Sequence, residues 1–289
     1  MIGYLIAGVA LIGSLIGSWT DIKTREVSNW VSFGLIFALL GLRVVEGFVI
    51  GSFDTFLVCL GVGGAFFVMG LVLFYSQQWG GADLKLITAF GIGFGVLPLG
   101  FLPLNIGPWP FFLTLLMNFF IITVVYSVAY AVKKALNEPK VMKDFKKSMH
   151  KHEPIIGLAL ILISIVIGMY YTWLSWMVFI PLLWFMSRFL KAVEKNCMYR
   201  EVTVNQLVEF DIPEVAIKVG KKVIAGTKDP NGMTLEQIAE IKKLVKAGKL
   251  PRKFNVKWGV PLIPVFPITL VVTLWYGDVL LAFLKLLTA

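Results

Sequence analysis

Long apolar runs alternate with short polar connections along the chain, and these runs are its first structural signal. An α-helix needs about 20 mainly apolar residues to cross a bilayer core. We therefore predict an all-α polytopic membrane protein with about eight transmembrane helices. The predicted spans are Ile2–Trp19, Trp30–Val45, Phe53–Tyr75, Leu84–Leu102, Trp109–Val132, Ile155–Tyr171, Trp173–Phe189 and Val260–Leu287.

The apolar stretch 155–189 is too long for a single crossing. We predict a transmembrane hairpin there, because aromatic side chains typical of the membrane–water interface gather near its middle. These side chains are Tyr170, Tyr171, Trp173 and Trp176. The last span begins with Pro261, Pro264 and Pro267, which are expected to break or unwind its first turns.

One polar segment, 190–258, has the pattern of a small soluble domain. Runs of β-branched residues at 202–210 and 215–224 predict strands. The segment Thr234–Gln237 has the pattern of a capping box and predicts a helix that continues to about Lys246. We predict a small α+β insert.

Composition supports a membrane protein, because 58% hydrophobic residues, 15% charged residues and a mean hydropathy of +0.82 exclude an ordinary water-soluble fold. The chain has 27 basic and 17 acidic residues, a net charge of +10. Most of the basic residues lie in 133–151 and 188–257. By the positive-inside rule we predict that both segments are cytoplasmic, which places Asp21 and Asp83 on the cytoplasmic side.

The two cysteines, Cys59 and Cys197, exclude a disulfide framework and an all-cysteine zinc site. No metal or cofactor is expected. Glycines at 61, 63, 64, 91, 93 and 95 are expected to let transmembrane helices pack closely. For Arg43, Glu46 and Asp54 we expect local pairing or interfacial positions.

Asp21 and Asp83 are the residues most suited to chemistry. Asp21 ends the first span, and Asp83 opens the fourth span after Gly80-Gly81-Ala82. Taken separately, Asp21 could be a solvated loop carboxylate and Asp83 a helix cap. Taken together on one membrane face, two carboxylates sharing one proton form the acid–base pair that adds water to a peptide carbonyl. The glycines would let an extended peptide come close.

The segments Asp21-Ile22-Lys23-Thr24-Arg25-Glu26-Val27-Ser28-Asn29 and Gly80-Gly81-Ala82-Asp83-Leu84-Lys85 resemble the two aspartate motifs of the type IV prepilin peptidase family, in its archaeal preflagellin and prepilin peptidase branch. Like presenilin, these enzymes are Gly-x-Gly-Asp membrane aspartyl proteases. The resemblance covers roughly the first 130 residues. Ala82 replaces the second glycine of the motif, and Ser28 stands where many members have proline.

The resemblance implies Asp21 and Asp83 as the catalytic pair, and Gly80, Gly81 and Ala82 as the loop before the second aspartate. It implies cleavage of a short basic leader, the class III signal, from prepilin-like or archaellin precursors at the cytoplasmic membrane face. Bacterial members also N-methylate the new terminus, and many carry a tetracysteine segment. This chain has no Cys-x-x-Cys pair, so we expect peptidase activity alone.

A proton-coupled transporter could use the same carboxylates, and a non-catalytic scaffold acting through the insert is a third reading. We favour the protease, with the lipid bilayer and the precursor as partners and no nucleic acid. The predicted organisation is a catalytic transmembrane core over 1–132, a basic cytoplasmic loop over 133–154, the hairpin over 155–189, the insert over 190–258 and a last transmembrane helix over 259–289.

Overall fold

The computed structural model describes residues 1–289 except 77, 151, 171–178, 221, 228–231 and 289. The chain divides into two units. The first unit combines 1–127 and 260–289 with the short segment 228–232, and the second combines 128–227 with 233–259.

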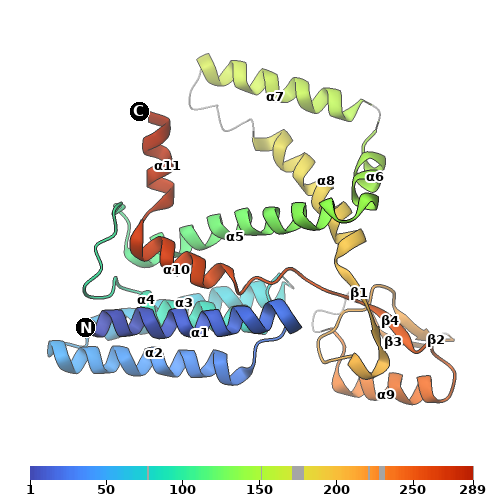
Figure 1. Ribbon diagram of the computed structural model, residues 1–289, viewed down its shortest axis with the longest axis horizontal. Coiled ribbons are helices and arrows are strands. Elements are labelled where there is room, and N and C mark those ends of the chain that lie inside the picture. Colours follow the sequence, from blue (N-terminus) through green and yellow to red (C-terminus); the bar gives the residue numbers. More distant parts are fainter. Residues whose placement is uncertain (77, 151, 171–178, 221, 228–231, 289) are drawn as a thin grey trace. The chain divides into compact units, whose positions relative to one another are not determined.

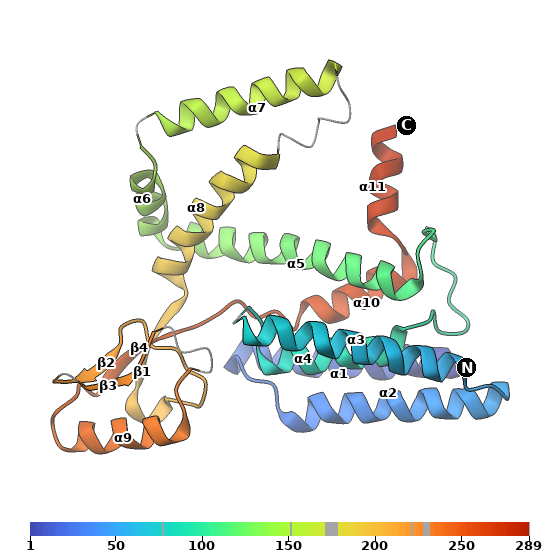
Figure 2. The ribbon, with the colours of Figure 1, turned by 180° about the vertical axis from the view of Figure 1, so that it is seen from behind.

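Four helices of the first unit lie side by side (Figures 1 and 2). They are α1 (Ile2–Thr24), α2 (Asn29–Ile50), α3 (Asp54–Tyr75) and α4 (Gly81–Phe94). The helix α5 (Phe111–Leu136) begins in this unit, where Leu115 and Phe119 join its apolar core. Among the described residues, four helices are long and apolar enough to cross a membrane, namely α1, α2, α3 and α5. The structure therefore supports a mostly helical membrane protein, and the predicted number of eight spans is not confirmed.

The helix α4 is shorter than the predicted span Leu84–Leu102. Its 14 residues cover about 21 Å, whereas a bilayer core is about 30 Å thick. Arg43 of α2 explains where α4 ends. Its guanidinium donates hydrogen bonds to the carbonyls of Gly93 (2.6 Å) and Val96 (2.8 Å), which the helix cannot satisfy itself.

Arg43 is almost completely buried and also pairs with Glu46 on the same helix. The expected local pairing is present, but the pair lies inside the protein and not at an interface. Buried charges are tolerated where they are paired and hydrogen-bonded, and Arg43 meets both conditions.

Close contact between two glycines holds α4 against α3. A Cβ atom built on Gly91 would lie 2.8 Å from the Cα of Gly63, and one built on Gly63 would lie 2.4 Å from the side chain of Ile92. Cβ atoms built on Gly61 and Gly64 would meet nothing within 4 Å. A Cβ atom built on Gly93 would lie 3.0 Å from the Leu39 side chain, and one built on Gly95 would lie 2.8 Å from the Cα of Cys59. The predicted role in helix packing is thus confirmed for the glycines at 63, 91, 93 and 95 but wrong for those at 61 and 64.

The last apolar run forms two helices where a single one was predicted. They are α10 (Val265–Trp275) and α11 (Val279–Thr288), separated by Gly277 with a φ of 85°. Asn118 of α5 holds this break, since its amide donates to the Thr273 hydroxyl (3.0 Å) and to the Gly277 carbonyl (2.7 Å). The predicted break at the start of the run is confirmed, because Pro264 caps α10 and the residues before it are not helical.

The second unit contains α6 (Pro139–Ser148), α7 (Glu153–Tyr170) and α8 (Phe179–Cys197). The predicted turn of the hairpin lies largely outside the described residues, because three of its four aromatic residues fall in 171–178.

The insert is a small α+β domain, as predicted. Its core includes Met233, Ile238, Ile241 and Val256, all buried. The capping box of its helix is present: the Thr234 side chain accepts a hydrogen bond from the Gln237 N–H (3.3 Å), and the Gln237 side chain accepts one from the Thr234 N–H (2.9 Å). The elements are β1 (Tyr199–Thr203) paired with β4 (Lys253–Lys257), β2 (Ile217–Val219) paired with β3 (Lys222–Ala225), a 3₁₀ turn (Val204–Gln206) and α9 (Leu235–Lys246); both strand pairs are antiparallel.

Candidate active site

Asp21 lies in the last turn of α1 and is 8% exposed. One of its carboxylate oxygens accepts a buried hydrogen bond of 3.1 Å from the backbone N–H of Ile263. Ile263 belongs to the non-helical segment just before α10. The interpretation of Asp21 as a solvated loop carboxylate is therefore wrong. Asp21 is helical, mostly buried and hydrogen-bonded to a distant segment.

Small side chains let three segments meet beside Asp21. Gly17 lies one helical turn before Asp21 on the same face of α1. A Cβ atom built on Gly17 would lie 3.3 Å from the side chain of Ile263 and 3.9 Å from the side chain of Leu86 on α4. Because Leu86 is three residues after Asp83, this contact places the end of α1 and the start of α4 at the same end of the first unit.

Asp83 lies in the first turn of α4 and is 9% exposed. Its carboxylate accepts a hydrogen bond of 2.9 Å from the N–H of Gly80, which is the N-cap residue. Asp83 therefore supports the helix start from the third helical position and is not the N-cap residue that was expected. Asp83 is outside the four candidate spans. Burial, and to a smaller extent the neighbouring charge of Asp21, raise its pKa to about 7, although the hydrogen bond from Gly80 opposes this rise. The two aspartates are thus near enough to interact electrostatically.

The loop before Asp83 has ordinary backbone geometry. Gly80 is extended, with a φ of −82°, and Gly81 starts α4. Neither glycine uses the left-handed conformation that favours this residue type. Ala82 packs partly buried against the apolar core, so alanine in place of the second motif glycine fits the fold.

A hydrogen bond joins the two aspartate motifs directly. Lys85 donates to the side-chain oxygen of Asn29 at 2.6 Å, and its ammonium lies 4.7 Å from the centre of the Phe33 ring. Asn29 is the last residue of the first motif and Lys85 the last of the second. Sequence reasoning did not assign Asn29 a role, although its position at the end of a recognised motif was an available signal.

Two further groups near Asp21 were also missed. The N–H of Ile263 has no side-chain signature, and the proline pattern around it indicated only a broken helix. Arg25 ends α1 in the left-handed conformation, with a φ of 61°, and interacts electrostatically with Asp21. Among the residues that the structure describes, no group of three or more histidine, cysteine or acidic side chains could hold a metal ion.

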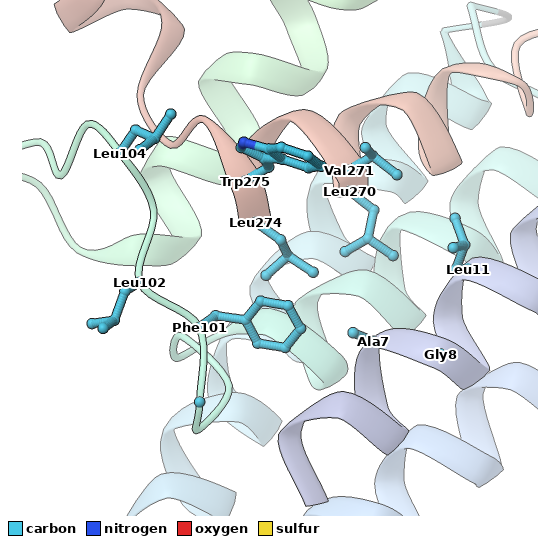
Figure 3. Close-up of a pocket in the computed structure, with 11 residues that line it drawn as sticks. Ala7, Gly8, Leu11, Phe101, Leu102, Leu104, Leu270, Val271, Leu274 and Trp275 are labelled. Atoms are coloured by element: carbon cyan, nitrogen blue, oxygen red, sulfur yellow. The ribbon is translucent and has the colours of Figure 1, made fainter. Parts of the chain in front are cut away.

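An apolar cavity of about 470 Å³ lies elsewhere in the first unit (Figure 3). Three segments line it: α1, the loop before α5, and α10. The lining residues are Ala7, Gly8, Leu11, Gly100, Phe101, Leu102, Leu104, Leu270, Val271, Leu274 and Trp275. Leu11 is ten residues from Asp21, or about 15 Å along the helix. The cavity has no ionisable lining residue and is separate from the two aspartates.

Comparison with known proteins covers the part of the chain that carries this site. Residues 8–132 match a sequence model of the type IV leader peptidase family. This region resembles the type IV leader peptidases. The resemblance drawn from the two aspartate motifs is therefore confirmed for the leader peptidase region, residues 8–132, which contains both Asp21 and Asp83.

A curated relative agrees with this result. The preflagellin peptidase of Methanococcus voltae is 34% identical over 98 residues, which are 32% of this chain and 37% of the relative. The chain thus covers little more than a third of that protein. No solved structure matches the chain.

Proposed function

We propose that this protein is a membrane aspartyl endopeptidase that removes the short basic leader from prepilin-like or preflagellin-like precursors. The observation that carries the proposal is the pair of mostly buried aspartates, Asp21 and Asp83, at adjoining helix ends within the leader peptidase region. The named activity of the Methanococcus voltae relative supports the same substrate class.

The geometry suits hydrolysis of a peptide bond by an acid–base pair. With a pKa of about 7, Asp83 is protonated in about half of the molecules at neutral pH, and this acid form can donate its proton to the carbonyl oxygen of the scissile bond. Asp21 then accepts the proton of the attacking water. When the tetrahedral intermediate collapses, Asp21 passes that proton to the leaving amine and Asp83 regains a proton from a hydroxyl group of the intermediate. Both carboxyl groups then return to their starting state. The two groups titrate as one coupled pair.

The proposal includes the cytoplasmic membrane face as the place of cleavage. Asp21 is at the end of α1 that carries Lys23 and Arg25, and the positive-inside rule assigns such ends to the cytoplasm. A leader leaving the membrane on that side would present its scissile bond beside Asp21 and Asp83.

Incubation of the purified full chain in detergent with a precursor bearing a class III signal tests the function. We expect cleavage at one bond, detected by mass spectrometry, and the same rate with a metal chelator. The variants Asp21→Asn and Asp83→Asn should lower the rate by about 10²-fold to 10⁴-fold, the contribution typical of a positioned acid or base.

Asp54→Asn is the matched control, since Asp54 is exposed at the start of α3, where its carboxylate accepts a hydrogen bond from the Ser52 hydroxyl. It should cleave at the wild-type rate. Robust cleavage by either variant of the pair would exclude the dyad. Absence of cleavage by the wild type would instead favour the transporter or scaffold readings. An unmethylated product terminus is expected, even with a methyl donor present.

A further inference from the structure

The helix α6 lies between two apolar helices, α5 and α7, and short connections join it to both. Two residues separate it from the end of α5, which is a candidate membrane span, and four separate it from the start of α7. A connection of this length reaches at most about 11 Å from α5. The helix α6 is therefore held close to the point where α5 ends.

The apolar face of α6 is used inside the protein. Val141 is completely buried in a small core with Ala131, Ala192 and Val193. The Phe145 ring packs edge-on against Phe189, with 5.8 Å between the ring centres. Because this face is occupied by other side chains, α6 cannot bind a membrane by inserting it.

The opposite face of α6 is basic and exposed. At 100° per residue its four lysines fall within an arc of about 120°. None of the four forms an ion pair with a residue that the structure describes, whereas Asp144 of the same helix pairs with Lys195 at 2.8 Å. We name this surface the α6 lysine face. It consists of Lys140, Lys143, Lys146 and Lys147.

Four like charges on neighbouring turns repel one another, and an anionic surface facing them would relieve this repulsion. The end of α5, a candidate membrane span, adjoins α6, so the nearest anionic surface is that of the bilayer. Basic segments next to a membrane span attract the anionic headgroups of the bilayer. We propose that the α6 lysine face binds anionic lipid headgroups, as a docking surface that is independent of the proteolytic site.

Thermal unfolding of the full chain in mild detergent tests the proposal, with added phosphatidylglycerol or phosphatidylcholine of the same acyl chains. Phosphatidylglycerol should raise the unfolding midpoint of the wild type more than phosphatidylcholine does. The variant K140Q/K143Q/K146Q/K147Q should lose most of this difference, with at least about tenfold weaker apparent affinity, since each lysine contributes roughly fivefold. Its midpoint in phosphatidylcholine should be at least as high as that of the wild type, because the repulsion among the lysines is removed, which shows that it folds.

Two further variants act as controls. The arginine variant K140R/K143R/K146R/K147R keeps the charge and should keep the response. The variant K242Q/K243Q/K246Q/K249Q removes four charges from the insert and should also keep it. The proposal is overturned if the wild type does not prefer phosphatidylglycerol, if the α6 variant keeps the full response, if the insert variant loses it equally, or if inorganic phosphate alone reproduces it.

Discussion

The two aspartates of the candidate site are held in different ways. Asp83 is fixed by its own helix start, through a hydrogen bond from Gly80 three residues before it. Asp21 is fixed by Ile263, which is 242 residues away in the sequence. The difference shows that one half of the site is a local property of a short motif, whereas the other half depends on the C-terminal part of the chain.

The largest effect is expected when the helix that carries Asp83 is displaced. Gly91→Leu places a side chain where even a Cβ atom would contact the α3 backbone. Because the obstacle is backbone, we expect a loss of about 3 kcal/mol or more in stability and loss of most cleavage activity. Gly64→Leu is the matched control on an open face and should change stability by less than about 0.5 kcal/mol. Equal effects of the two variants on the unfolding midpoint would contradict the glycine contact.

A second change acts on Asp21 from a distance. Ile263→Pro removes the N–H that bonds the carboxylate, whereas Ile263→Ala removes only the side chain and keeps that N–H. Since hydrogen bonds to charged groups are worth roughly 1.5–3 kcal/mol, we expect the proline variant to cleave about 10-fold to 100-fold more slowly than the alanine variant. Similar values of kcat/KM for the two variants would show that the bond does not position Asp21.

The pH dependence of cleavage tests whether Asp83 acts in its protonated form. The acid form of Asp83 is present below its pKa of about 7, so cleavage should fall by about tenfold per pH unit above that value. Stability should respond in the same direction. Burial raises the pKa of folded Asp83 above its ordinary value of 3.8, so folding takes up a proton and stability falls as pH rises from about 4 to about 7, then levels off.

Asp83→Asn removes this titration and serves as the control. At pH 8 the variant should be more stable than the wild type, by at most about 4 kcal/mol, and near pH 4 the two proteins should have similar unfolding midpoints. A wild-type stability that is constant between pH 4 and pH 8 would show that Asp83 does not titrate in this range.

The smallest expected effect comes from the bond between the two motifs. Asn29→Ala removes the acceptor of the Lys85 hydrogen bond at an exposed site. We therefore expect kcat/KM to fall only a few-fold and the free energy of unfolding to fall by less than about 1 kcal/mol. Lys85→Met should give a similar loss, and the double variant should lose no more than either single variant. Additive losses in that cycle would show that the two side chains act independently.

Structural features that depend on residues close together in the sequence were predicted well from local sequence patterns. The Thr234–Gln237 capping box and the role of Asp83 at a helix start both follow from residues three positions apart, and both are present. The nearness of Asp21 and Asp83 could be predicted from their shared membrane side and their motifs, although they lie on different helices.

Features that depend on distant segments were predicted less well. The early end of α4 results from Arg43, which acts from another helix, so the apolar run to Leu102 carries no sign of it. The break between α10 and α11 depends on Asn118 and Gly277, which are far apart in the sequence. The glycines at 61 and 64 were indistinguishable from those at the helix contact, because composition does not show which face of a helix packs.

The buried arginine of α2 also has a consequence for biogenesis. The carbonyls that Arg43 binds belong to residues at the end of α4, which a ribosome synthesises about 50 residues later. Until α4 arrives, an arginine within an apolar helix costs roughly 2.5–3.5 kcal/mol in the bilayer. The second helix therefore receives the full set of partners for Arg43 only after α4 has been made.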